Sequence, residues 1–378
     1  MERCIVRKRD NWKQKFDELG FSFHSMGGVY WNEGACYEFT SEEIDHLEEV
    51  TAELHTLCLQ AVDNVIDRNL FRKLGIPERW GAYATESWKR KDPSLYGRFD
   101  FSYDGKGEPK LLEYNADTPT SLVESSIAQW VWLEEMFPAY DQFNSIHEKL
   151  QDAFAAVKST LPLQQPFYFT CVQDHEEDFV TVEYLRDVAV QSGLDGRHIF
   201  IGDIGFLAEA KRFCDQDNNP IEYAFKLYPW EWLLADEFGE NVINGGIRFF
   251  EPAWKMILAN KGILPLLWEM APGHKNLLPS FFEEGRITGD VVRKPFFSRE
   301  GANVVLTAGG RTYEGTDANY GSEGTVYQQA HPLPNFDGSH AVDGSWVVNG
   351  LPAGLGIRED RTPITTNTSL FVPHFFQP

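Results

Sequence analysis

Hydrophobic residues recur at helical spacing in the segment that follows residue 40. Leu47, Val50 and Leu54 lie three or four positions apart, as on the buried face of an amphipathic helix. The run Thr40-Ser-Glu-Glu43 before them is a capping box, in which a hydroxyl and a carboxylate satisfy unpaired amides of the first turn. The pattern predicts a long helix that begins after Thr40 and ends near Leu70.

Polar and aromatic residues alternate over residues 96–103, which is the two-residue period of a β-strand. Turn-forming residues follow at 104–107, and Lys110-Leu-Leu-Glu-Tyr114 resumes the strand pattern. We therefore expect an antiparallel hairpin. A symmetric turn would place Asp100 opposite Glu113 and Arg98 opposite Asn115, with all four side chains on one face.

The rest of the chain predicts a mixture of helices and strands. Ser121-Leu-Val-Glu124 is a second capping box, before a helix that runs to about Met136. Residues 166–206 show the strand, helix and strand of a βαβ unit. Residues 251–282 predict mainly helix, and the polar, glycine-containing residues 314–324 predict a mobile loop.

We expect these elements to form three parts of an α+β protein. Residues 1–160 would hold the N-terminal helices and the hairpin, and residues 161–250 the βαβ subdomain. Residues 251–378 would form a lobe with a phosphate-binding turn. A chain of 378 residues is long enough for such cooperating parts.

Composition narrows the class of protein. The hydrophobic fraction of 42% is typical of a globular protein, and no stretch approaches the roughly 20 apolar residues of a membrane span. Charges recur in the first ten residues, and the five cysteines form no Cys-x-x-Cys pair. We therefore expect a cytoplasmic protein with reduced thiols and no membrane partner.

The formal net charge of −23 at pH 7 disfavours nucleic acid as a partner. The same charge suits a cationic substrate such as a polyamine, although acidity can also serve solubility alone. The sequence contains no Gly-x-Ser-x-Gly elbow, His-Glu-x-x-His motif or Walker loop. Those absences disfavour serine hydrolases, zinc proteases and P-loop enzymes.

The predicted hairpin carries the most informative side chains. Asp100, Glu113 and Asn115 supply two carboxylates and an amide oxygen, a hard donor set that suits Mg²⁺. Arg98 beside them could neutralise charge on a transferring phosphoryl group. The alternative is a surface hairpin in which Arg98 bridges both acids, and the pattern alone leaves the two interpretations equal.

Further cationic side chains lie in glycine-edged segments. A predicted strand ends at Lys294, and the following turn contains Gly301, where backbone amides could approach a phosphate. A plain hairpin is the simpler interpretation of that segment. The charged run that includes Arg358 indicates either the rim of a site or a solvated turn. Lys226 and Lys261 are equivocal, because a lone lysine is usually exposed.

Eight segments occur here in an order typical of one known family. They are residues 94–100, 109–122, 225–231, 251–255, 260–270, 294–303, 328–329 and 356–360. Together they resemble the synthetase domain of the glutathionylspermidine synthase family, above all its single-domain acid–amine ligases, which lack the amidase domain. Each segment alone is weak, but the ordered set is specific.

The resemblance implies an ATP-grasp fold, like that of glutathione synthetase, with a Rossmann-like pre-ATP-grasp subdomain and with ATP and Mg²⁺ as cofactors. It implies Asp100, Glu113 and Asn115 as Mg²⁺ ligands. The residues implied to contact ATP or its phosphates are Arg98, Asp100, Lys261, Lys294, Gly301, Gln328, Gln329, Ala330, His331 and Arg358. Among these, Arg98 and Arg358 would be catalytic: Arg98 would stabilise the transition state, and Arg358 would assist at the γ-phosphate or acyl phosphate. Residues 328–331 would form the adenine hinge.

The resemblance also implies a reaction. ATP would convert a carboxylate into an acyl phosphate, which an amine would attack to give an amide, ADP and phosphate. The partners would be a small-molecule acid and amine, while the oligomeric state stays open. A regulatory ATP-binding protein or ATPase without ligase activity, and a phosphotransferase, are the alternatives.

Substrate contacts are implied at four further positions. Thr118 and Thr120 could supply hydroxyl contacts, and Glu176 and Glu177 fall where the family contacts glutathione. The two glutamates could instead cap the following helix. The region around Leu227 differs from the family's substrate wall, so glutathione and spermidine remain open as substrates.

Overall fold

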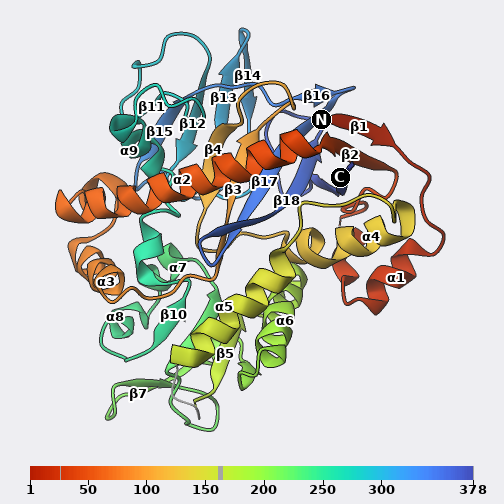
Figure 1. Ribbon diagram of the computed structural model, residues 1–378. Coiled ribbons are helices and arrows are strands. Elements are labelled where there is room, and N and C mark those ends of the chain that lie inside the picture. The colour runs from red at the N-terminus through yellow and green to blue at the C-terminus, as the bar shows by residue number, and fades with distance from the viewer. Residues whose placement is uncertain (26, 161–164, 378) are drawn as a thin grey trace.

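The computed structural model describes residues 1–25, 27–160 and 165–377 (Figure 1). A six-stranded sheet has the order β19-β18-β17-β3-β4, with β16 paired to β17. Its strands are β3 (Tyr96–Ser102), β4 (Lys110–Asn115), β16 (Asn335–Phe336), β17 (Ser339–Val348), β18 (Leu351–Asp360) and β19 (Leu370–Val372). The sheet therefore joins the hairpin to strands from the other end of the sequence.

A second sheet of five strands has the order β11-β15-β12-β13-β14. Its strands are β11 (Ser280–Phe281), β12 (Val291–Pro295), β13 (Val305–Ala308), β14 (Arg311–Glu314) and β15 (Thr325–Gln329). All of its pairings are antiparallel. The turn between β12 and β13 holds the predicted phosphate-binding segment.

Three smaller sheets complete the strands of the described residues. The four-stranded sheet is parallel, in the order β10 (Arg248–Phe250), β9 (Tyr223–Leu227), β5 (Phe167–Cys171) and β6 (Gly196–His198). The three-stranded sheet joins β1 (Glu2–Ile5), β2 (Ala35–Thr40) and β20 (His374–Gln377), and the two-stranded sheet joins β7 (Gly205–Leu207) and β8 (Arg212–Cys214). The parallel sheet agrees with the predicted βαβ unit.

The helices cover these sheets. They are α1 (Trp12–Glu18), α2 (Ser41–Asp67), α3 (Glu78–Lys89), α4 (Gln129–Met136), α5 (Ile146–Thr160), α6 (Glu176–Gln191), α7 (Trp230–Ala235), α8 (Gly239–Val242) and α9 (Ile263–Met270). Figure 1 shows α2 crossing β3, β4 and β17, while α5 and α6 lie beside β5. Among the described helices, none has both the length and the apolar character needed to cross a membrane.

The capping box at Thr40 is confirmed. The Thr40 hydroxyl accepts a hydrogen bond from the Glu43 amide, and the Glu43 carboxylate accepts one from the Thr40 amide. Leu47, Val50 and Leu54 are fully buried, and they pack in the same core cluster as aromatic residues of β3. One face of α2 is therefore fixed on the six-stranded sheet, as the hydrophobic period predicts.

The hairpin register is also confirmed. Asp100 lies opposite Glu113 and Arg98 opposite Asn115, and a bulge follows Asp100. The other face of the hairpin is held by Phe99 and Tyr114, whose rings stack at 3.9 Å. Because aromatic packing fixes one face, the four polar side chains must share the opposite face.

One helix prediction is confirmed in part and another is wrong. Residues 122–136 are helical, as predicted, but the Ser121 side chain does not cap them, because its hydroxyl bonds the Tyr30 hydroxyl and its backbone has a φ of 68°. Residues 251–282 are mostly irregular, with the short 3₁₀ helix η5 (Ala253–Met256), α9 and, near the end, the strand β11. Prolines and glycines in this stretch interrupt the helical hydrogen bonds.

Three other predictions concern the loop at residues 314–324, the helix of the βαβ unit and the division into three parts. Residues 315–324 carry neither helix nor strand, and their mobility stays a prediction. The helix α6 begins at Glu176, earlier than predicted, and ends before Gly193, whose φ is +85°. The expected boundary at residue 161 lies outside the described residues, so the three-part division also stays a prediction.

Candidate active site

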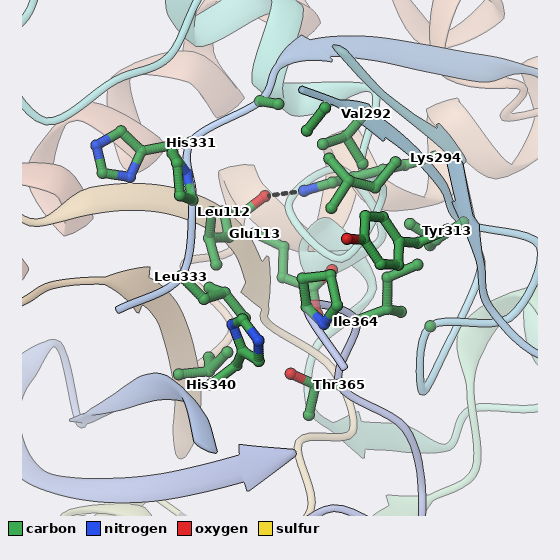
Figure 2. A pocket seen from close by; sticks show the side chains of 18 of the residues that line it. Leu112, Glu113, Val292, Lys294, Tyr313, His331, Leu333, His340, Ile364 and Thr365 are labelled. Carbon is green, nitrogen blue, oxygen red and sulfur yellow. Dashed lines mark hydrogen bonds between the residues drawn. The ribbon is translucent and has the colours of Figure 1, made fainter. Parts of the chain in front are cut away.

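A cavity of about 470 Å³ lies between the six-stranded and five-stranded sheets. Figure 2 shows Val292, Lys294 and Tyr313 along one side of this space, with His331 and His340 on the other. The volume is within the range of sites for small molecules. Its lining combines apolar side chains with charged ones, among them Asp100, Glu113, Lys261 and Lys294.

The polar face of the hairpin contributes Asp100 and Glu113 to the lining of the cavity. Arg98 donates to both Asp100 carboxylate oxygens, with Nε–Oδ1 at 2.6 Å and Nη2–Oδ2 at 3.0 Å. The Asn115 amide nitrogen lies 3.0 Å from Asp100 Oδ2 and 3.1 Å from Glu113 Oε1. The structure thus brings all four predicted side chains into one cluster.

The donor set of this cluster fits Mg²⁺. In the described ranges no group of three or more His, Cys, Asp or Glu residues could hold a metal, and this cluster contains only two carboxylates. Mg²⁺ needs few protein ligands, because waters and phosphates supply the others. A rotation of the Asn115 amide by about half a turn would present its oxygen between the carboxylates of Asp100 and Glu113.

Two buried lysines lie beside the cluster. Lys261 Nζ is 3.0 Å from Glu113 Oε2, and Lys294 Nζ donates to Gln328 Oε1 at 2.7 Å and to the Leu112 carbonyl at 2.8 Å. Burial would raise the pKa of Glu113, but the two ammonium groups hold it below its usual value. Burial lowers the pKa of Lys294 to about 8. Lysines are rarely buried, so their convergence here indicates a site for an anion.

The turn between β12 and β13 closes over these lysines. The Ser298 carbonyl accepts a hydrogen bond from Lys261 Nζ, and Gly301 lines the cavity with a φ of +71°. A Cβ at Gly301 would lie 2.6 Å from the Thr365 carbonyl oxygen. The close approach of two backbone segments therefore requires glycine at this position.

Only part of the stretch expected to form an adenine hinge lines the cavity. Ala330 and His331 line the cavity. Gln328 is buried behind it and bonds Lys294 and the Leu111 carbonyl. Gln329 is exposed and lies outside the lining residues.

A small cavity of about 30 Å³ adjoins this large one beside Asp100. Arg98 and Arg358 both line it, and Asp100, Val342 and Thr365 line both cavities. Arg358 is held by the Thr366 and Ser369 carbonyls, at 2.9 and 3.0 Å. Two strands of one sheet thus bring the two predicted catalytic arginines to the same place.

The predicted substrate residues line neither cavity. The Thr118 hydroxyl accepts from Arg299 at 2.6 Å, and the Thr120 carbonyl accepts from Arg98 at 2.6 Å. Glu176 bonds the Ser22 hydroxyl at the start of α6. Glu177 is buried, and burial raises its pKa.

Several residues of this region were not predicted from the sequence. Arg299, in the predicted phosphate-binding turn, contacts both Thr118 and Glu231, and its neighbour Glu300 lines the large cavity. Their place next to Gly301 was the available signal. Lys226 forms a buried ion pair with Asp117 at 2.7 Å, and no local pattern indicates that pairing.

Comparison with known proteins gives one family. The sequence profile described as "Glutathionylspermidine synthase preATP-grasp" matches residues 3–377. A protein of Haemophilus influenzae named "Putative acid–amine ligase" is 41% identical over 386 residues, which cover 98% of either chain.

More distant relatives are longer proteins. Trypanothione synthetase of Crithidia fasciculata is 29% identical, over 84% of this chain and 53% of that protein. Bifunctional glutathionylspermidine synthetase/amidase of Escherichia coli is 26% identical, over 96% of this chain and 63% of that protein. The solved structure of a glutathione synthetase-like effector from Globodera pallida, 10% identical, has a TM-score of 0.59 and covers 98% of this chain and 100% of the effector, which shows a shared fold.

Proposed function

The chain belongs to the glutathionylspermidine synthase family of carbon–nitrogen ligases, and from this premise we propose that it uses ATP and Mg²⁺ to join a small carboxylic acid to an amine. Its α+β fold is of the ATP-grasp type. One observation carries the proposal. The Asp100 and Glu113 carboxylates line the same cavity as Lys261 and Lys294. A site with both signs of charge suits a metal–polyphosphate complex.

The shape of the large cavity suits a nucleotide. Its apolar walls, which include Val292, Leu306 and Leu333, would hold the adenine ring, and Lys261 and Lys294 would contact the phosphates. Lysines act on phosphates as compact point charges. The lysines and the apolar walls would thereby hold the terminal phosphate beside Asp100 and Glu113.

Asp100, Glu113 and Asn115 would hold Mg²⁺. When bound, the ion neutralises phosphate charge and so favours transfer of the terminal phosphoryl group. In its absence Arg98 and Lys261 balance the two carboxylates, which explains how opposed acids are tolerated in the hairpin. Arg98 would then be released to contact the transferring group.

The reaction needs a carboxylate that accepts the phosphoryl group and an amine that then accepts the acyl group. A carboxylate oxygen attacks the terminal phosphorus and ADP leaves, after which the amine nitrogen attacks the acyl carbon and phosphate leaves. Arg98 and Arg358 flank the small cavity where this acyl carbon would lie, and they would stabilise the charge on the phosphoryl oxygens. The enclosed position would also keep water from the acyl phosphate.

For the substrates we propose a glutathione- or peptide-like acid and a polyamine-like amine. The names of the distant relatives support this choice, and the net charge of −23 favours a cationic amine. Thr118, Thr120, Glu176 and Glu177 are the proposed contacts with the acid. We also propose a cytoplasmic location and no nucleic-acid partner.

The test is release of ADP by the enzyme with ATP and Mg²⁺ across a panel of acids and amines. We expect release that requires both an acid and an amine, with the amide identified by mass spectrometry. Asp100→Ala and Arg358→Ala should each lower turnover by about 10²-fold or more. Asp195→Ala, which removes an exposed ion pair with Arg197, should not.

Other outcomes would support other functions. Release of ADP without an amine requirement would indicate an ATPase, and a stable phosphorylated product would indicate a phosphotransferase. Wild-type turnover in Asp100→Ala would contradict the assignment of the cavity.

A further inference from the structure

A buried chain of hydrogen bonds leads away from the small cavity between Arg98 and Arg358. Ser121 lines this cavity, and its hydroxyl lies 3.2 Å from the Tyr30 hydroxyl. Tyr30 in turn donates to Glu124 Oε1. Ser121 and Tyr30 are each 2% exposed and Glu124 is 0% exposed, so bulk water does not reach the chain.

When the Glu124 carboxyl is ionised, the direction of both hydrogen bonds is set. A tyrosine hydroxyl carries one hydrogen, and Tyr30 gives it to Glu124. Ser121 must therefore donate to Tyr30, which leaves the serine oxygen as an acceptor toward the cavity. The other carboxylate oxygen of Glu124 is buried and has no hydrogen-bond partner among the described residues.

The charge environment suits a proton acceptor. Burial, with the Glu177 carboxylate of α6 nearby, raises the pKa of Glu124 to about 7. The hydrogen bond from Tyr30 and the Arg358 guanidinium of β18, which lies 5.6 Å from the Tyr30 ring, act in the opposite direction. A group that titrates near neutral pH can both take up and release a proton during turnover.

The local backbone departs from regular structure at the same residues. Ser121 has a left-handed φ of 68°, and Glu124 begins the π-helical segment η3 (Glu124–Ala128) that precedes α4. Strained non-glycine residues and π-helical turns are concentrated at functional sites. In this chain the two departures aim Ser121 at the cavity and Glu124 at Tyr30.

We propose that Ser121, Tyr30 and Glu124 form a proton relay for the attacking amine, an inference that rests on the proposed ligase function. As the nitrogen–carbon bond forms and the carbon–oxygen bond to phosphate breaks, the nitrogen gives a proton to Ser121 Oγ. The Ser121 hydrogen passes to Tyr30, and the Tyr30 hydrogen passes to Glu124, which becomes neutral. The reverse transfers return the proton to solvent once the product has left the cavity.

The roles of the three residues differ. Ser121 would face the amine, whereas Tyr30 and Glu124 act through it as positioning residues. Formation of the acyl phosphate needs no proton acceptor, because a carboxylate is its nucleophile. The relay is therefore required only for the second half of the reaction.

The first test is independent of activity. Infrared spectra between about pH 5 and about pH 9 should show a protonated carboxyl band that disappears near pH 7 in the wild type and is absent in Glu124→Gln. Tyr30→Phe should move the midpoint upward, because the lost hydrogen bond stabilised the carboxylate. A carboxyl that does not titrate in this range would overturn the relay.

The second test separates the two halves of the reaction with ATP, glutathione and spermidine as probes. Exchange of ¹⁸O between bridge and non-bridge positions of ATP, with glutathione alone, reports formation of the acyl phosphate. We expect Glu124→Gln and Tyr30→Phe to lower amide formation by about 10²-fold and to leave this exchange unchanged. The fall of kcat toward acidic pH, seen in the wild type, should be absent in Glu124→Gln.

Tyr168→Phe is the matched control, since it removes a tyrosine–carboxylate hydrogen bond of 2.8 Å to Asp215, which lies outside both cavities. It should change neither half of the reaction. Equal loss of both halves in Glu124→Gln, or no loss, would overturn the proposal. A wild type that forms no amide with any amine would contradict the proposed function, and the infrared titration would still decide whether Glu124 exchanges protons.

Discussion

Lys294 faces the cavity with a pKa lowered by burial to about 8, so its charge depends on pH in the range where enzymes are assayed. The ammonium form prevails below this pKa and the neutral amine above it. We expect the affinity of the free enzyme for a non-hydrolysable ATP analogue to fall as pH rises through about 8.

Calorimetric Kd values between about pH 6.5 and about pH 9.5 would measure this dependence, and Lys294→Arg should show little of it because a guanidinium stays charged. An unchanged affinity across this range in the wild type would show that Lys294 does not contact the phosphates.

The ion pair of Lys226 with Asp117 is a second residue whose charge matters, here for stability. Both side chains are at most 1% exposed, and Asp117 also accepts from the Trp230 amide at 2.8 Å. Asp117→Asn leaves a buried ammonium unpaired, so we expect the free energy of unfolding to fall by about 3–5 kcal/mol in urea titrations. Burial lowers the pKa of Lys226, and the variant should therefore regain stability as pH rises.

Asp195→Asn is the control for this variant, because its partner Arg197 is exposed. It should change the free energy of unfolding by less than about 1 kcal/mol. If both variants lose equally little free energy of unfolding, the buried ion pair is not coupled to folding. The sequence could not predict the role of Lys226, because its partner lies 109 residues away and a lone lysine carries no local signal.

At the scale of elements, the turn between β12 and β13 depends on Gly301. An added Cβ would combine a φ of +71° with contacts of 2.6 Å to the Thr365 carbonyl and 2.8 Å to Ile364. Ile364 and Thr365 both line the cavity, so Gly301→Ala should displace its wall and raise the Kd of an ATP analogue about tenfold.

Gly285→Ala is the matched control for the turn. It shares a positive φ, of +80°, but its Cβ would meet no atom within 4 Å. Nucleotide binding should be unchanged in this variant. An equal loss in the two variants would assign the effect to general strain and not to the cavity wall.

Elements were predictable where their determinants are close in sequence. The register of the hairpin follows from alternation across one short turn, and the cap of α2 from residues three apart. Ser121 was misassigned because its hydroxyl bonds Tyr30, 91 residues earlier. Residues 251–282 read as helix from their apolar content, but Ile257 and Leu258 are buried by other elements of the core.

The same distinction applies to the site. The polar face of the hairpin was visible in the sequence, and the family resemblance located Lys261, Lys294 and Arg358. The Ser121–Tyr30–Glu124 chain joins segments with no shared local pattern, so only the packed structure brings it together. Contacts between residues far apart in the sequence cannot be predicted from local sequence patterns.

At the scale of the whole molecule, the cavity exists only when the two sheets are packed together, so the proposed nucleotide should bind only the folded chain. A ligand that binds only the folded state adds about 2.7 kcal/mol to stability when present at 100 times its Kd. We expect a non-hydrolysable ATP analogue with Mg²⁺ to raise the free energy of unfolding by this amount, measured in urea.

Lys294→Ala provides the comparison at the same analogue concentration. It should gain clearly less stability than the wild type, because its Kd is higher. An equal gain in both proteins would place the nucleotide outside the cavity.

The position of β17 between β3 and β18 has a consequence for biosynthesis. The ribosome makes the hairpin long before β17, which begins at Ser339, so β3 has an unpaired edge until β17 emerges. Phe99 and Phe101, fully buried in the folded protein, lack part of their packing in the nascent chain. Such a chain is open to aggregation and to chaperones, and the strands that carry Asp100 and Glu113 acquire their final support only once β17 has been made.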